Sequence, residues 1–99
     1  MNLNIIIPVY NEKNTIEIIV DKVLQYKELS SKMIIVNDGS TDGTQDILNK
    51  LEIKYPERVK ILNHVKNLGK GAAIRTAIKN LDSDIVLIQD ADLEYDPSD

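Results

Sequence analysis

The feature that most constrains this 99-residue sequence is an alternation of short apolar runs with amphipathic stretches. Four runs rich in Ile and Val lack the polar alternation of a half-exposed strand, so each suits a strand buried on both faces of a parallel sheet. These runs are Leu3 to Val9, Met33 to Val36, Val59 to Leu62 and Ile85 to Ile88. Parallel strands need crossover connections, which helices usually supply.

The three segments between the runs carry apolar residues at helical spacing. The stripes are Ile16, Ile19, Val20, Val23 and Leu24, then Ile47, Leu48, Leu51 and Tyr55, then Ile74, Ala77, Ile78 and Leu81. The order β-α-β-α-β-α-β predicts one α/β domain over residues 1–99, with an open, mainly parallel, Rossmann-like sheet and right-handed crossovers. Ligands of such sheets bind outside the carboxyl ends of the strands.

The helix starts carry signals of their own. Asn14 with Glu17, and Asp42 with Gln45, have the spacing of capping boxes. The third helix has no such pair and opens at residues 67–71, where glycines leave backbone N–H groups accessible. We expect that an anion can bind there.

Composition and charge exclude several kinds of site. With no Cys and one His, the chain has no thiolate nucleophile and no Cys- or His-rich metal centre, so a metal here must be a hard cation on oxygen ligands. Residues 82–99 contain seven acids and no Lys or Arg, which leaves nine acids against 12 bases in residues 1–81. This distribution argues against a nucleic-acid surface and fits either a cation at the acidic end or a solvated tail.

Targeting signals are not evident in the sequence. The longest apolar runs are far shorter than the ~18 residues of a membrane span, and the N-terminus lacks a basic stretch followed by an apolar core. We therefore expect a cytoplasmic protein.

Asp90 and Asp92 follow the fourth apolar run and are two residues apart, so in an extended chain both carboxylates point to the same side. Such a pair suits Mg²⁺ or Mn²⁺, which complete their coordination with water and phosphate oxygens. The alternative is two turn-forming aspartates in water. The position directly after a buried strand strengthens the metal interpretation, and both stay open.

Other polar residues also lie at predicted strand ends. Asp38 ends the second run, where nucleotide-binding α/β domains often hold a ribose hydroxyl with an acid; the alternative is an Asx turn with the two residues that follow. Lys70 could neutralise a phosphate or be one more solvated Lys. Glu12 could be a surface acid stabilised by a helix N-terminus. His64 has no obvious partner, so we expect it to face solvent or form a local hydrogen bond.

Two well-known phosphate motifs are absent. Residues 69–71 read Gly-Lys-Gly without the Ser or Thr and the earlier Gly of a Walker loop, and residues 8–14 contain no glycine for a Gly-x-Gly-x-x-Gly turn. P-loop NTPases and dinucleotide oxidoreductases are thereby excluded. A non-catalytic nucleotide-binding or receiver-like module stays open as an alternative, although Glu12 stands alone where a receiver normally has an acidic pair.

Four segments resemble the signatures of family 2 glycosyltransferases, which have the GT-A fold. They are Ile7 to Glu12, Ile35 to Thr44, Asn67 to Arg75 and Ile88 to Pro97. The last is most similar to the branch that includes dolichol-phosphate mannosyltransferases and bacterial polyprenyl-phosphate sugar transferases. The resemblance covers essentially the whole chain and implies the N-terminal, nucleotide-sugar-binding half of a GT-A fold.

The resemblance implies a role for each matching residue. The residues implied in binding the donor are Pro8, Tyr10, Glu12, Asp38, Lys70, Arg75 and Asp90. Asp90 and Asp92 would form the DxD pair that holds Mg²⁺ or Mn²⁺, with Asp92 closest to the metal. The ion would neutralise the nucleoside diphosphate that departs from a GDP- or UDP-linked sugar, while an acceptor oxygen would attack the anomeric carbon and invert it.

The resemblance also implies what this sequence lacks. It stops just after the DxD segment, so the acceptor pocket, any catalytic base and any membrane-associated tail would lie outside it, and no catalytic residue is assigned. We expect a fragment, truncated after the DxD loop, that binds a nucleotide weakly and transfers no sugar by itself. The implied acceptor is a polyprenyl or dolichyl phosphate or a glycan, reached at the cytoplasmic membrane face. A bare fourth-strand edge would favour self-association.

Overall fold

The computed structural model describes residues 2–25, 30–81 and 85–89. Within them, four parallel strands form one sheet in the order β3-β2-β1-β4. The strands are β1 (Asn2–Val9), β2 (Ser30–Asp38), β3 (Val59–His64) and β4 (Ile85–Ile88). The helices are α1 (Ile16–Leu24), α2 (Thr44–Lys54) and α3 (Lys70–Lys79). The predicted order of elements and the parallel sheet are confirmed.

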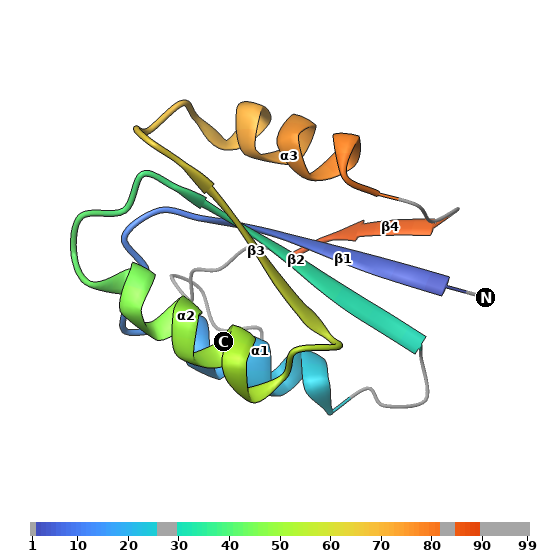
Figure 1. Cartoon of the computed structure of the whole chain (residues 1–99). Helices are drawn as coiled ribbons and strands as arrows, with labels where there is room; N and C mark the ends of the chain where they lie inside the picture. Colours follow the sequence, from blue (N-terminus) through green and yellow to red (C-terminus); the bar gives the residue numbers. More distant parts are fainter. Residues whose placement is uncertain (1, 26–29, 82–84, 90–99) are drawn as a thin grey trace, which may run out of the picture.

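The helices cover both faces of the sheet. Helices α1 and α2 lie on one face and α3 on the other (Figure 1). In β1, Ile5 and Ile7 pack into the cluster beneath α1 and α2, whereas Ile6 packs beneath α3. All three are buried, which explains why the run shows no polar alternation.

Helix α3 packs on the sheet through two alanines. Ala73 and Ala77 are completely buried against a cluster that includes Ile6. The predicted stripe placed Ile78 in the core, and this is wrong because Ile78 is 52% exposed. The contact face is centred on the Ala73–Ala77 line, and Ile78 is rotated by about 100° from Ala77, away from that line.

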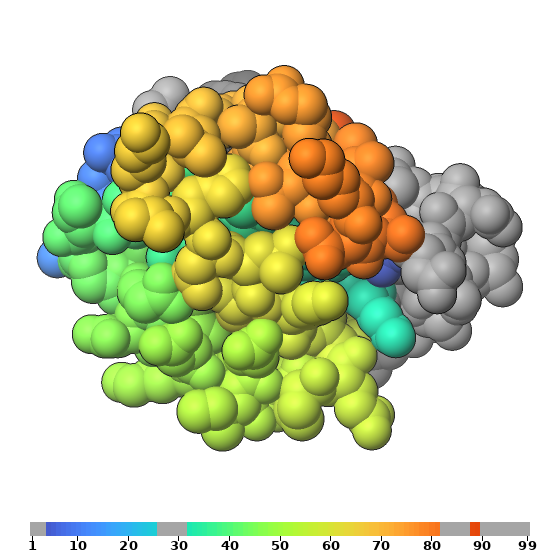
Figure 2. Space-filling model, turned by 45° about the horizontal axis from the view of Figure 1, so that its top comes forward, coloured from blue at the N-terminus to red at the C-terminus, as the bar shows by residue number. Residues whose placement is uncertain are grey.

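Strand β3 departs from the prediction of burial on both faces. Val59 is buried, but Ile61 and Leu62 are only partly buried and Lys60 is exposed. The strand is at one edge of the sheet, with β2 as its neighbour. Figure 2 shows β3, in yellow, between α3 and α2 at the surface.

The predicted capping boxes are not formed. Helix α1 begins at Ile16, and the hydroxyl of Thr15 donates to Glu12 Oε2 at 2.9 Å. Helix α2 begins at Thr44, whose N–H donates to Asp42 Oδ1 at 3.0 Å, but Gln45 does not complete the box. These side chains bond within and between loops, where spacing along the chain does not predict their partners.

Candidate functional site

The carboxyl ends of the strands meet at one edge of the sheet (Figure 1). Val9 of β1 pairs with Asn37 of β2, and on the other side Ile6 pairs with Ile88 of β4. The pairing continues past β4, because Gln89 N–H donates to Ile6 O at 2.9 Å. The chain is thus directed toward this edge immediately before Asp90. Asp90 and Asp92 themselves lie outside the described residues.

The loops after β1 and β2 are joined by Asn11. Its N–H donates to Ser40 Oγ at 3.0 Å, and its Oδ1 accepts the N–H of Thr41 at 2.7 Å. Asn11 has a φ of 52°, a left-handed conformation that Asn tolerates better than most residues. The two loops are therefore held as one surface.

A second connection between these loops runs through Thr44, the first residue of α2. Its hydroxyl is fully buried with the side chain, accepts the N–H of Glu12 at 3.1 Å and donates to Asp42. Asp42 also accepts the N–H of Lys13 at 3.4 Å. Burial raises the pKa of Asp42, but these hydrogen bonds, led by that from Thr44, outweigh it and lower the pKa.

The turn after β2 is held by the side chain of Asn37, near the end of that strand. Its Oδ1 accepts the N–H of Ser40 at 3.1 Å, and its amide donates to Gln45 Oε1 at 2.6 Å. The sequence alternative was an Asx turn of Asp38 with the two residues that follow, but the N–H of Ser40 donates to Asn37, three residues earlier. Asp38 is thereby left to bond elsewhere.

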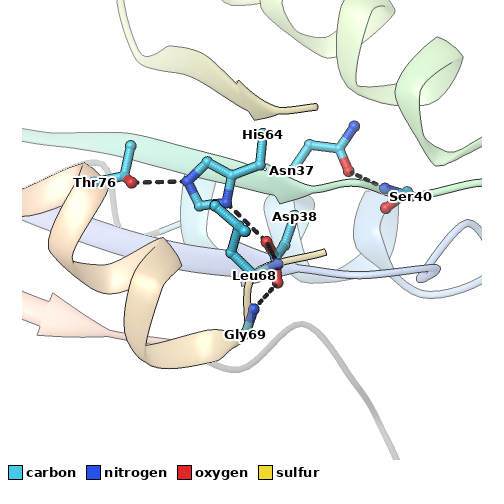
Figure 3. A network of polar contacts seen from close by, with 7 residues as sticks. All are labelled: Asn37, Asp38, Ser40, His64, Leu68, Gly69 and Thr76. Carbon is cyan, nitrogen blue, oxygen red and sulfur yellow. Dashed lines mark hydrogen bonds and ion pairs between the residues drawn. The ribbon is translucent and has the colours of Figure 1, made fainter. Parts of the chain in front are cut away.

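The carboxylate of Asp38 binds the start of α3. Its Oδ1 accepts the N–H of Leu68 and its Oδ2 the N–H of Gly69, both at 2.8 Å (Figure 3). We predicted accessible N–H groups and an anion at this helix start. The anion is a side chain of the protein itself, so these two N–H groups are already occupied.

The same carboxylate contacts His64. Nδ1 of His64 lies 2.7 Å from Asp38 Oδ1, and Nε2 lies 2.7 Å from Thr76 Oγ1 on α3 (Figure 3). The side chain of His64 is only 8% exposed. The expectation that it faces solvent or bonds locally is therefore wrong, because its partners are 26 and 12 residues away.

These contacts set the charge of Asp38. Burial is the largest influence and raises its pKa, but the hydrogen bonds from His64, Leu68 and Gly69 together outweigh it. The pKa of Asp38 is therefore below its ordinary value. A buried carboxylate that stays ionised this way is a fixed negative charge at the edge of the sheet.

The remaining residues that we predicted to bind the nucleotide-sugar donor lie at or near the same strand ends and on α3. Pro8 is partly buried in β1, Tyr10 is 46% exposed just after it, and the carboxylate of Glu12 accepts the hydroxyl of Thr15. Lys70 and Arg75 are exposed on α3. Lys70 begins the helix beside the Asp38 contact, whereas Arg75 is about 7.5 Å further along its axis.

The described residues show neither a metal cluster nor a membrane-spanning helix. No three His, Cys, Asp or Glu side chains among them come together as metal ligands. None of the helices in the described segments has the length and apolar character needed to cross a membrane.

Comparisons with known proteins agree with this architecture. The model of Glycosyl transferase family 2 matches residues 4–99. The dolichyl-phosphate beta-glucosyltransferase of Homo sapiens is 35% identical over 91% of this chain and 31% of its own length, and the dolichol-phosphate mannosyltransferase of Pyrococcus furiosus is 33% identical over 98% and 27%.

A solved structure shows the same fold. The mannosyltransferase of Pyrobaculum calidifontis, in complex with GDP-Man and Mn²⁺, matches with a TM-score of 0.82 and 29% identity over 91% of this chain and 27% of its own. The chain thus spans about a third or less of the length of these relatives. With its parallel sheet and the match across residues 4–99, the chain belongs to glycosyl transferase family 2 and has the α/β architecture of the GT-A fold.

Proposed function

We propose that this chain forms the nucleotide-sugar-binding part of an inverting glycosyltransferase that uses a divalent cation. The observation that carries the proposal is the convergence of the β1, β2 and β4 ends on one edge, with the first two loops joined through Asn11. Open parallel sheets bind their ligands at this edge. The GDP-Man and Mn²⁺ bound to the Pyrobaculum mannosyltransferase support it.

The proposed cation would be held by Asp90 and Asp92, which follow the end of β4. Their donor atoms are carboxylate oxygens, which suit Mg²⁺ or Mn²⁺. When bound, the ion supplies positive charge to the phosphates of the leaving nucleotide.

The donor itself would lie over the joined loops. We assign Pro8, Tyr10, Glu12 and Asp38 to the base and ribose. Pro8 and Asp38 are at the ends of β1 and β2, and Glu12 is in the loop after β1. Tyr10, just after β1, is 46% exposed and has an aromatic ring on which a base can stack. Lys70 is beside this edge and suits the diphosphate, whereas Arg75, further along α3, is the less direct contact.

For the whole protein we propose a polyprenyl or dolichyl phosphate acceptor at the cytoplasmic membrane face. The human and Pyrococcus relatives, a dolichyl-phosphate glucosyltransferase and a dolichol-phosphate mannosyltransferase, support this acceptor class. The family match over residues 4–99 favours a glycosyltransferase over a non-catalytic or receiver-like module. We assign no catalytic base within the chain and expect no sugar transfer by residues 1–99 alone.

Calorimetry with GDP and with UDP, each with and without Mn²⁺, tests the proposal. We expect one nucleotide to bind in a Mn²⁺-dependent manner, and Asp92→Ala to abolish that dependence. Asp99→Ala removes an acid from the same run outside the DxD pair and is the matched control. If the folded wild-type chain binds neither nucleotide, or if both variants lose binding equally, the proposal is wrong for this chain.

A further inference from the structure

The imidazole of His64 is a buried titratable group to which the proposed donor site gives no role. It is at the last residue of β3, directly opposite Asp38 in the register of β2 and β3. Its two ring nitrogens contact Asp38 and Thr76, so it joins a strand end, a carboxylate and α3 (Figure 3). A histidine engaged at both nitrogens has its ring orientation fixed.

The chemistry of its partners defines the proton positions. The ionised Asp38 can only accept, so Nδ1 of His64 carries a proton and donates it. In the neutral imidazole, Nε2 accepts the hydroxyl hydrogen of Thr76. Asp38 therefore selects the tautomer with the proton on Nδ1, and the Thr76 hydroxyl, which donates to Nε2, holds the other side of the ring.

His64 in turn fixes the orientation of the carboxylate. Oδ1 of Asp38 is shared by His64 and the N–H of Leu68, while Oδ2 accepts the N–H of Gly69. Of these three hydrogen bonds to Asp38, loss of the imidazole would leave two, both from adjacent backbone N–H groups of one loop. Because a carboxylate oxygen can accept two hydrogen bonds, Oδ2 keeps capacity for a donor group of a ligand.

We propose that His64 is a positioning residue for nucleotide binding, which holds the Asp38 carboxylate and, through it, the start of α3 in the arrangement that receives the nucleotide. The inference rests on the proposed function. It assigns Thr76 a supporting role, because the hydroxyl orients the imidazole from the side opposite to Asp38.

Three variants distinguish a positioning role of His64 in nucleotide binding from a contribution to the stability of the fold alone. His64→Leu removes both contacts, His64→Gln keeps an N–H donor and a carbonyl acceptor on one side chain, and Thr76→Val removes only the hydroxyl. Asn63→Leu, an exposed neighbour in β3, is the matched control. Nucleotide affinity is measured by calorimetry with GDP or UDP and Mn²⁺, after circular dichroism has established that each variant is folded.

We expect His64→Leu to weaken binding about tenfold and Thr76→Val about threefold, with His64→Gln restoring most of the loss and Asn63→Leu unchanged. If the wild-type chain binds a nucleotide and folded His64→Leu and Thr76→Val bind it equally well, the inference is overturned while the proposed function stands. If the wild-type chain binds neither nucleotide, both are overturned.

A spectroscopic measurement is independent of how well the variants fold. The chain has one His, so every imidazole ¹⁵N signal belongs to His64 and needs no assignment. We expect a protonated Nδ1 in the free chain, and a shift of the signals when nucleotide and Mg²⁺ are added. Signals that do not move at saturating nucleotide would overturn the inference, since a residue with a structural role alone would not respond.

Discussion

Gly39 and Asn67 bring two loop backbones into direct contact: a Cβ atom on Gly39 would lie 2.5 Å from the backbone nitrogen of Asn67 and equally close to the carbonyl carbon of Lys66. The obstructing atoms are backbone, so no side-chain rotation relieves the overlap. Gly39 also has a φ of 77°, which favours glycine. The loop that carries the Asp38 contacts can approach β2 only because residue 39 has no side chain.

Gly39→Ala should therefore destabilise the fold by about 3 kcal/mol, from both overlap and backbone strain. Gly43→Ala is the matched control, because Gly43 has a similar φ of 98° but nothing within 4 Å of a Cβ. It should cost about 1 kcal/mol, from strain alone. Urea unfolding followed by circular dichroism compares the two. Equal losses would show that the loop contact is not as tight as described.

Thr44 offers a second test of how the loops are joined. Thr44→Val keeps the shape but removes the hydroxyl that accepts the Glu12 N–H and donates to Asp42, so unfolding free energy should fall by about 2 kcal/mol. Thr44→Ser retains the hydroxyl and should keep more of this stability. Thr41→Val, on an exposed side chain, should have little effect in the same urea titration. Unchanged stability of Thr44→Val would contradict the assigned bonds.

The order of elements was predictable because a strand buried on both faces of a sheet consists of a continuous run of apolar residues. The central strand β1 reads Ile5-Ile6-Ile7, with successive side chains packed on opposite faces of the sheet. Element limits were less predictable. Strand β2 begins at Ser30, before its first apolar residue Met33, because backbone pairing with β1 extends further than the core does.

The candidate site was predicted as a location but not as a network. Asp38 could be placed at a strand end, yet its contacts with His64 and Leu68 join residues 26 and 30 positions apart. Such contacts depend on the register of β2 and β3, which local spacing does not encode. The turn after β2 illustrates the same limit: Asn37 and Asp38 are adjacent and chemically alike, and only the folded backbone decides which of them accepts the N–H of Ser40.

Asp38 should also make stability depend on acid pH. Its pKa is lower in the folded chain than its ordinary value of 3.8, so its stabilising contribution is complete above that value and is lost as pH falls through the folded pKa. Thermal melts between pH 6 and about 2 measure this loss. Asp38→Asn should be less stable at pH 6 and show a shallower decline with acid. Asp42→Asn should share the trend, because the pKa of Asp42 is lowered as well. Parallel pH curves for wild type and Asp38→Asn would contradict this assignment.

The two edge strands of the sheet, β3 and β4, differ in their capacity to pair with a second copy of the chain. Edge strand β3 carries an exposed Lys60, a charge of the kind that discourages edge pairing. Edge strand β4 reads Ile-Val-Leu-Ile without a charge, and among the described residues it pairs only with β1. We therefore expect self-association through β4.

Sedimentation velocity over a range of concentrations measures this association. Ile88, on β4, is 48% exposed, and Ile88→Lys would add a charge to this strand and reduce the associated fraction. Ile53→Lys changes a more exposed apolar residue on α2, which packs beside β3 at the side of the sheet opposite β4, and should leave association through β4 unchanged. A monomer at every concentration would refute pairing through β4, and an equal effect of both substitutions would indicate a non-specific apolar contact instead.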